Sequence, residues 1–540
     1  MARHTFPWPS TRAFLSIFLL AWAVSPKAAL AQLWTLLTGK RVRAWHRIGR
    51  LAARHPDHYW RWRARFLPAI IRAWVGQDPA RTEVKITQLP ITAGQSLFDW
   101  LQAAGQADWL VPMLPGDMPH PELATLVAVA AGRHPQARIL YWDEDVDTSG
   151  GPCQPWLKPA WDPLLHRARD CLSGAAALHR SSALAILTHQ PDLSADAAGL
   201  AALLTAMVAD GIVPVHVPLV LTTRSRLPTV PEYWPGLVQR EWPDWAVAGQ
   251  SNGFLQICPP DPSLWPTVSI IVPTRDRADL LETCLAGLAQ LDYPAQIEII
   301  IVDNGSTQPD ALAFMKDAAA GGRVRLLRDD GPFNYSRLNN QAAAVAKGTY
   351  LCLLNNDVEA IDGAWLSQLV RHAVQPGVAA VGARLLYPDG SIQHAGVTVG
   401  LGDAAGHVQR GINPASACHF AWHGVSRCVS AVTGACLLVS AADFVRVGGL
   451  DERGFAVAFN DVDLCLKLGA SGASIIYCAE ATLIHAESRT RPRDDRPDQQ
   501  ARFQCELALL QSRWSTADGK DPHHNPLFDR ASEQCLLALA

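Results

Sequence analysis

From residue 268 onward, short apolar runs alternate with stretches in which apolar residues recur every three or four positions. The runs VSIIVP, IEIIIVD, RVRLLRD and TYLCLLNN contain mainly Val, Ile and Leu, which is typical of strands buried in a parallel sheet. The stretches between them predict helices, so the pattern indicates right-handed βαβ units. Ligands bind beyond the carboxyl ends of the strands in such sheets. Polar residues follow the second and fourth runs, at that edge.

The region from about residue 83 to residue 224 repeats part of this pattern. Residues 107–147 run strand, Asp, helix, strand and acidic turn in the same order as residues 349–390. Residues 200–225 likewise parallel residues 462–489. The first region lacks a counterpart of VSIIVPTRDR and of the Asn-Asp-Val-Asp cluster. We therefore predict a degenerate copy without the half that would hold a nucleotide, and chance similarity between two α/β segments is the alternative.

Length and charge limit the classes of protein to consider. At 540 residues, the chain is longer than one hydrophobic core usually supports, so two or three domains are expected. A net charge of −3 argues against a nucleic-acid-binding protein. Residues 40–72 nonetheless contain ten Lys and Arg and one acid, Asp57, with aromatic residues between them. This composition suits an anionic membrane surface, and a solvated helical face that packs on the next domain is the alternative.

The first thirty residues fit either a secretory signal or a membrane-associating helix. Arg3 and Arg12 precede an apolar run at 13–24, and Ala-Leu-Ala at 29–31 is similar to a signal-peptidase site. The run is too short to span a bilayer. The twelve cysteines are scattered singly, without a Cys-x-x-Cys pair, which favours a reducing compartment.

Six segments between about residue 266 and residue 490 carry a resemblance to a known family. They are VSIIVPTRDRADLL, IVDNGS, LLNND, SAVTGACLLV, GGLDERGFAVAFNDVDLCLKL and LIHAESRTR, in this order. Together they resemble family 2 glycosyltransferases of the GT-A type, similar to bacterial rhamnosyltransferase-like enzymes of surface-polysaccharide and O-antigen assembly. The resemblance implies an α/β fold with an open, mostly parallel twisted sheet flanked by helices. The first region resembles the same family in degenerate form.

The resemblance also implies the reactants. The donor would be a nucleotide sugar, the cofactor Mg²⁺ or Mn²⁺, and the acceptor a hydroxyl of a saccharide or lipid-linked saccharide. Activated nucleotide sugars are expected in the cytosol. We therefore favour a cytoplasmic protein whose N-terminal helix makes peripheral contact with the membrane over an exported one.

Residues after two predicted strands are expected to bind the donor. Asp303 ends a buried strand, so its carboxylate can accept hydrogen bonds from a nucleobase or ribose. Pro273 and Arg275 follow the preceding strand and belong to the same predicted site. An Asx turn or a helix N-cap at Asp303 is the alternative.

LLNND stands where the family has Asp-x-Asp, and Asn355 replaces the first acid. Asp357 is the sole carboxylate, which suffices because one carboxylate, diphosphate oxygens and water can hold Mg²⁺ or Mn²⁺. Asn355 or Asn356 is expected to bind the ribose or the sugar. His485 is a candidate metal ligand and Arg489 a candidate diphosphate ligand. A structural role for His485 is the alternative.

The cluster at 460–463 precedes a predicted helix. The resemblance implies that Asp461 is the general base, which takes the acceptor proton in a single inverting displacement. Stabilisation of the helix N-terminus by this acid is the alternative. Asp463 is expected to orient the helix or the acceptor pocket, and the resemblance places Gly434 on the acceptor side.

Four segments are predicted. Residues 1–82 are signal-like or membrane-associating, 83–250 the degenerate copy, 266–490 the catalytic domain, and 491–540 a tail with a helix ending near Trp514. The polar segment RTRPRDDRPDQQ is a candidate lid. A dinucleotide-binding dehydrogenase is excluded because VPTRDR stands where a Gly-x-Gly-x-x-Gly turn is needed. A non-catalytic sugar-binding or scaffolding protein built from two such domains remains the alternative.

Overall fold

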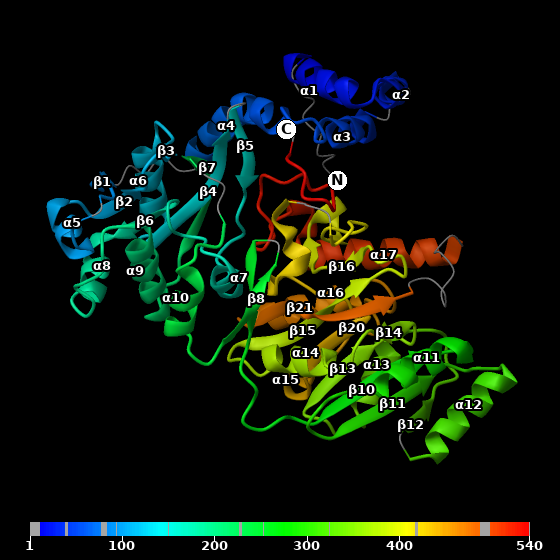
Figure 1. The fold of residues 1–540 in the computed structure, drawn as a ribbon. Coiled ribbons are helices and arrows are strands. Elements are labelled where there is room, and N and C mark those ends of the chain that lie inside the picture. The colour runs from blue at the N-terminus through cyan, green and yellow to red at the C-terminus, as the bar shows by residue number, and fades with distance from the viewer. Residues whose placement is uncertain are drawn as a thin grey trace.

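The computed structural model describes residues 11–538 except for gaps at 38–40, 77–83, 93, 149–150, 226–228, 252, 323, 416–418 and 487–496. The described chain forms two large sheets with helices packed on them (Figure 1). They are preceded by the helices α1 (Thr11–Val24), α2 (Pro26–Leu37), α3 (Arg41–Ala52) and α4 (His58–Gly76). The predicted α/β class is therefore confirmed.

The larger sheet, of ten strands, is formed by the C-terminal half of the chain. Only β20 and β14 run against the other strands on its main path, so the sheet is open and mostly parallel, as predicted. β16 (Ile392–His394) and β19 (Arg427–Val429) join it at the side. The order along the main path is β12 (Val324–Arg328), β11 (Ile297–Asp303), β10 (Val268–Thr274), β13 (Tyr350–Leu354), β20 (Cys436–Ser440), β15 (Val378–Leu386), β21 (Ser474–His485) and β14 (Val358–Ala360).

Helices cover both faces of this sheet. Val268, Ile270 and Val272 of β10 pack in one hydrophobic cluster, whereas Ile271 belongs to a second. Successive side chains of a strand point to opposite faces, so a strand covered on both sides needs apolar residues at consecutive positions. The first cluster includes α11 (Ala278–Leu288), α12 (Pro309–Ala320) and α14 (Trp365–Ala373), and the second includes α13 (Tyr335–Ala343), α15 (Ala441–Arg446), α16 (Asn460–Ala470) and α17 (Pro497–Trp514).

The smaller sheet has seven strands and belongs to the first region. α4 and α6 (Leu123–Arg133) pack on one face, and α5 (Leu97–Ala103), α8 (Arg180–Leu187) and α9 (Ala197–Ala209) on the other. The order is β1 (Ile86–Pro90), β2 (Trp109–Met113), β6 (Ala176–His179), β4 (Ile139–Thr148), β7 (Val215–Arg224) and β3 (Met118–Pro119), with β5 (Gly151–Trp156) beside β4.

The two sheets share one topology. The path β1-β2-β6-β4-β7-β3 has the same order and the same relative directions as β10-β13-β20-β15-β21-β14. The prediction that the first region lacks a counterpart of VSIIVPTRDR is wrong in one respect. The strand in that segment, β10, has a counterpart in β1, which occupies the same position in the smaller sheet. Among the described strands of the smaller sheet, none corresponds to β11 or β12. The missing part is therefore the edge that carries Asp303 in the larger sheet.

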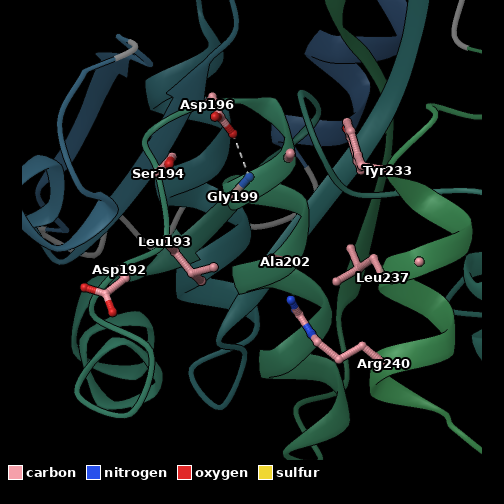
Figure 2. A pocket seen from close by; sticks show the side chains of 11 residues that line it. Asp192, Leu193, Ser194, Asp196, Gly199, Ala202, Tyr233, Leu237 and Arg240 are labelled. Atoms are coloured by element: carbon pink, nitrogen blue, oxygen red, sulfur yellow. Dashed lines mark hydrogen bonds between the residues drawn. The ribbon is translucent and has the colours of Figure 1, made fainter.

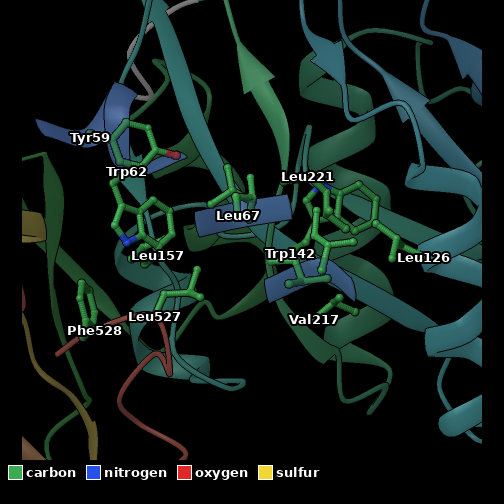
Figure 3. Close-up of a cluster of buried hydrophobic side chains, with 14 of the residues drawn as sticks. Tyr59, Trp62, Leu67, Leu126, Trp142, Leu157, Val217, Leu221, Leu527 and Phe528 are labelled. Carbon is green, nitrogen blue, oxygen red and sulfur yellow. The ribbon is translucent and has the colours of Figure 1, made fainter. Parts of the chain in front are cut away.

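The N-terminal residues form α1 (Thr11–Val24), α2 (Pro26–Leu37), α3 (Arg41–Ala52) and α4 (His58–Gly76). Tyr59, Trp62 and Leu67 of α4 are buried in the cluster that covers the smaller sheet (Figure 3). One face of the basic, aromatic stretch at residues 40–72 thus packs on the next domain. This was the alternative to the interpretation that the stretch meets an anionic membrane surface. None of the described helices combines the length and apolar character needed to cross a membrane.

The C-terminal tail contacts both sheets. α17 ends at Trp514, which confirms the predicted helix end. Beyond it, Asn525 donates a hydrogen bond to Asp143 of the smaller sheet at 2.8 Å. Phe528 packs edge-on against Trp422 at 5.8 Å between ring centres. Residues 489–496 of the predicted lid lie outside the described residues, and residues 497–500 form the first turn of α17 rather than a loop.

Candidate functional site

At the carboxyl edge of the larger sheet, polar residues from different strands meet. The first residue of β14, Val358, pairs with His485 at the end of β21. This register places Nε2 of His485 3.2 Å from Oδ1 of Asp357. Nδ2 of Asn355 lies 3.4 Å from the same Nε2. The structure thus brings together two predicted metal ligands and one predicted donor ligand.

The Asp357–His485 pair has the geometry of two neighbouring ligands of a divalent cation. Ligand atoms about 2.1 Å from Mg²⁺ and at right angles lie about 3 Å apart. Both residues are buried, with exposed fractions of 7% and 5%. Within the described part of the chain, the buried Nδ1 of His485 has no hydrogen-bond partner. A neutral imidazole with its proton on Nδ1 leaves Nε2 free for a cation, so this donor set fits a divalent ion.

The end of β10 lies beside this pair. Nδ2 of Asn356 donates to Oγ1 of Thr274 at 2.9 Å, so this amide fixes the loop after β13 to β10. Pro273 is buried within β10, and Arg275 follows the strand with an exposed side chain. The carboxylate of Asp276 accepts two backbone N–H bonds from the residues before α12, which lowers its pKa. The exposed side chain of Arg275 carries its Nε 3.9 Å from Oδ2 of Asp276.

Asp303 lies at the end of β11 and is almost fully buried. Its Oδ1 accepts a hydrogen bond at 2.8 Å from the backbone N of Ser306, three residues on, so the carboxylate also stabilises the turn after β11. Its Oδ2 lies 2.5 Å from Nη1 of Arg328 at the end of β12. The sequence did not indicate this ion pair, because Arg328 is the last residue of a strand whose only signal was its apolar run. A nucleobase or ribose at this edge would therefore meet an Asp–Arg pair.

Asp461 is the second residue of α16, whose N-cap is Phe459. Its carboxylate oxygens accept hydrogen bonds from the backbone N of Val462 and of Gly434, each at 2.8 Å. Stabilisation of the helix N-terminus, the alternative role for Asp461, therefore accounts only for the bond from Val462. Burial raises the pKa of Asp461, and the two N–H groups oppose that shift. A carboxylate with a raised pKa is a stronger base in its ionised form.

Short backbone contacts connect Asp461 to the Asp357 side of the edge. Gly434 donates to Asp461, and the carbonyl of the next residue, Ala435, accepts a hydrogen bond from the backbone N of Asn355 at 3.0 Å. The side chain of Asn355 in turn lies beside His485. Asp461 and the Asp357–His485 pair therefore flank the same loop.

Tyr335, at the start of α13, is a member of this site that sequence reasoning missed. Its Oη donates to the carbonyl of Gly434 at 2.7 Å. A Cβ at Gly434 would lie 3.0 Å from that Oη and 3.5 Å from Cβ of Asp461. Burial raises the pKa of Tyr335, and the charge of Asp461 adds to the shift. Tyr335 and Gly434 are far apart in the chain, so their contact leaves no pattern in the sequence around either residue.

α17 supports the loop in front of Asp461. The buried carboxylate of Glu506 accepts hydrogen bonds from the backbone N of Val457 at 2.9 Å and of Ala458 at 3.1 Å. Asp463 is fully buried, and its Oδ1 accepts from the side chains of Arg513 and Trp514, each at 2.9 Å. These contacts make Asp463 an anchor for α17. Arg489 lies outside the described residues.

The smaller sheet contains a counterpart of Asp357, and an arginine pairs with it. Asp117 precedes β3 as Asp357 precedes β14, and each strand pairs with the end of the equivalent long strand. Nε of Arg224 lies 2.8 Å from Oδ2 of Asp117, and Nη1 lies 3.1 Å from Oε2 of Glu144. A guanidinium thus lies beside this carboxylate, whereas the larger sheet has an imidazole beside Asp357; the residue opposite Met118 in the strand register is Thr223.

Two other acids of the first region, Asp143 and Asp145, form buried hydrogen bonds and ion pairs between packed elements. Asp143 accepts hydrogen bonds from the backbone N of Lys158 at 2.8 Å and from the side chain of Asn525, and lies 2.9 Å from Nε2 of His216. Asp145 accepts from Tyr59 Oη at 2.7 Å and pairs with Arg63 at 2.9 Å. Both are fully buried.

A pocket of about 400 Å³ opens between α9 and α10 (Trp234–Glu241) of the first region (Figure 2). Asp196 in its wall caps α9 by accepting a hydrogen bond from the backbone N of Gly199 at 2.8 Å. Tyr233, Leu237 and Arg240 line the other side. Among its described lining residues there is no carboxylate–histidine pair, so the candidate site remains the edge of the larger sheet.

Comparisons with known proteins add three relatives. The chain is 34% identical over 482 residues to "Uncharacterized protein y4gI" of Sinorhizobium fredii, which covers 85% of this chain and 52% of that protein. It is 32% identical over 456 residues to "O-antigen biosynthesis protein RfbC" of Myxococcus xanthus, which covers 81% of this chain and 35% of that protein. The chain therefore spans about half or less of the length of these two relatives.

The third relative is an N-acetylglucosaminyl-diphospho-decaprenol L-rhamnosyltransferase of Mycobacterium tuberculosis. The identity is 25% over 253 residues, which covers 42% of this chain and 78% of that protein. Residues 269–402 match the family model described as Glycosyl transferase family 2. This segment includes β10 to β13 and both Asp303 and Asp357. The C-terminal half of the chain therefore contains a glycosyl transferase family 2 domain.

Proposed function

We propose that the edge of the larger sheet is the active site of an inverting, metal-dependent glycosyltransferase. It would move a sugar from a nucleoside-diphosphate donor to a hydroxyl of a saccharide or lipid-linked saccharide. The observation that carries this proposal is the shared loop between Asp461 and the Asp357–His485 pair. Sugar transfer needs a cation for the leaving diphosphate and a base for the acceptor hydroxyl close together. The Asp357–His485 pair would hold the cation and Asp461 would be the base, and both flank this loop.

On the donor side, Asp303 and Arg328 would contact the base or ribose, and Arg275 and Asn355 the diphosphate or sugar. Arg489 would join the diphosphate. Asp357 and His485 would hold Mg²⁺ or Mn²⁺, which offsets the charge that develops on the leaving diphosphate. Pro273 is buried within β10 and Asn356 bonds to Thr274 of the same strand, so both would form the floor of this site.

On the acceptor side, Asp461 would take the proton of the attacking hydroxyl. Its two backbone N–H bonds fix the orientation of the carboxylate before substrate arrives, and oriented groups lose little freedom on reaction. Attack from the side opposite the leaving diphosphate gives a single displacement and inversion. Gly434 would lie on the acceptor side, where its missing Cβ lets Tyr335 approach closely, and Asp463 would hold α17 behind the pocket.

The names of two relatives support a role in surface-polysaccharide or O-antigen assembly. One relative is named for a lipid-linked saccharide acceptor, which fits a protein on the cytoplasmic face of a membrane. A screen of UDP-, GDP- and dTDP-sugars with Mg²⁺ or Mn²⁺ tests the proposal. Metal-dependent release of nucleoside diphosphate from one donor is the expected result, and no release from any donor would favour the non-catalytic alternative.

The smaller sheet is, in this proposal, a degenerate copy without catalytic function. Its topology matches the larger sheet, but β11 and β12 have no counterpart among its described strands. The guanidinium of Arg224 supplies a fixed positive charge beside Asp117 and Glu144. A divalent ion there would be repelled by that charge, so the copy would not hold a metal.

Asp117→Asn and Asp143→Asn should therefore leave turnover close to that of the wild type. Arg224 keeps its ion pair with Glu144 in the first variant, so the fold should persist. Asp143 accepts several buried hydrogen bonds, and its replacement should lower the melting temperature. Turnover and thermal unfolding measured together distinguish the two effects. A hundredfold loss of turnover in a folded variant would mean that the smaller sheet is a working site.

The pH dependence of turnover should report on Asp461. Its protonated form cannot accept the acceptor proton, so turnover should rise with pH through its pKa and then level off. Burial raises that pKa, so this acid limb should lie above the ordinary Asp value of about 3.9. Turnover measured from acidic to neutral pH checks this expectation. A flat profile down to the ordinary Asp range would contradict the assignment.

A further inference from the structure

The first helix presents an apolar stripe to the solvent. Leu15, Leu19 and Trp22 of α1 are 51%, 57% and 39% exposed. Their spacing places them on one side of the helix. Ile17 and Leu20 are buried in the cluster shared with α3, so the packing face of α1 is a different one. Three large apolar side chains of α1 thus remain uncovered by the described protein.

The second helix repeats this arrangement. Leu30, Trp34 and Leu37 of α2 are 50%, 70% and 80% exposed, with the same spacing as on α1. α1 and α2 contact each other, and both pack on α3. Figure 1 shows these three helices at the periphery, beyond the layers of the two sheets. Two neighbouring helices therefore each present a large apolar stripe. The surface of a soluble protein rarely exposes apolar patches of this size.

The charge of this region indicates what covers the stripes. The first 56 residues contain nine Lys and Arg and no Asp or Glu. Lys27 on α2 and Arg47 and Arg50 on α3 are exposed. An anionic phospholipid surface matches both features, because apolar side chains enter the acyl boundary while cations meet the headgroup phosphates. Tryptophan rings favour that boundary, and each stripe contains one.

The lengths of the helices determine how they would meet a membrane. α1 has 14 residues and α2 has 12. At 1.5 Å per residue, neither reaches across a hydrocarbon core of about 30 Å. They would lie in the plane of one leaflet instead.

We propose that the stripes of α1 and α2 form a docking surface for one leaflet of an anionic phospholipid membrane. The inference is independent of the chemistry at the larger sheet. Docking would hold the protein where a lipid-linked acceptor is presented.

Flotation of the purified full chain with vesicles tests this surface. The wild type should float with vesicles of phosphatidylcholine and phosphatidylglycerol, less with phosphatidylcholine alone, and less at high salt. Trp34→Ser combined with Leu37→Ser should reduce binding about tenfold or more, because two apolar side chains no longer enter the lipid. Both side chains are mostly exposed, so the fold should tolerate the change.

Leu264→Ser is the matched control, because Leu264 is 84% exposed and lies outside the helices. It should float like the wild type. Three results would overturn the proposal: no binding of the wild type to anionic vesicles, equal loss in the control, or a wild-type dimer that Trp34→Ser and Leu37→Ser dissociate without affecting flotation. The last result would mean that a second copy covers the stripes. Sugar transfer to a water-soluble acceptor should be the same in all variants, which separates this test from that of the active site.

Discussion

Replacing Asp461 with Asn should lower turnover about 10²–10⁴-fold, the usual contribution of a general base. Asn has the same shape but cannot take the acceptor proton. Donor affinity should barely change, because the carboxylate bonds to the loop of Gly434 rather than to the end of β11. Turnover and donor binding by calorimetry, measured on the same preparation, check both parts.

Asp463 is a poor control for this change, because its buried carboxylate anchors Arg513 and Trp514. Asp443→Asn is a better one. Asp443 lies in the first turn of the neighbouring helix α15, and its carboxylate pairs with Arg446 near the surface. Turnover of that variant should be close to wild type. If Asp461→Asn were equally active, the carboxylate would serve only to hold the start of α16 and the loop of Gly434.

Removing the metal should abolish transfer. EDTA should stop the reaction and added Mn²⁺ or Mg²⁺ should restore it, because the leaving diphosphate needs a cation beside it. Asp357→Asn should lose about a hundredfold or more, since the amide retains the size of the carboxylate but not the charge that holds the ion. Turnover across a metal titration measures both effects.

Asp117→Asn is the matched control for Asp357→Asn, because the two residues occupy equivalent positions in the two sheets. It should respond to metal as the wild type does. Full activity of the wild type in chelator would contradict the assignment of Asp357 and His485.

The fold of the larger sheet could be predicted because its strands are buried on both faces. β10 and β13 are almost continuously apolar. Such runs can be recognised as strands without knowing which strands lie beside them. β1 escaped prediction for the opposite reason. Its five residues, Ile86–Pro90, are only partly buried and include a Gln, so no run marks them. The shared topology therefore became evident only from the strand pairing.

The site could be predicted where a side chain follows a strand or starts a helix. Asp357 and Asp461 both have such positions, and His485 ends a strand. Tyr335, Arg328 and Glu506 could not be found in this way. They reach the site through contacts between elements distant in the chain, and packing rather than local pattern brings them there.

We propose that the edge of the larger sheet transfers sugar and that the smaller sheet does not. The most direct test is acceptor-dependent release of nucleoside diphosphate by the purified chain with Mn²⁺, compared among the wild type, Asp357→Asn and Asp117→Asn. We expect release by the wild type and Asp117→Asn and a loss of at least about a hundredfold in Asp357→Asn. Equal release by all three, or a loss in Asp117→Asn alone, would contradict it.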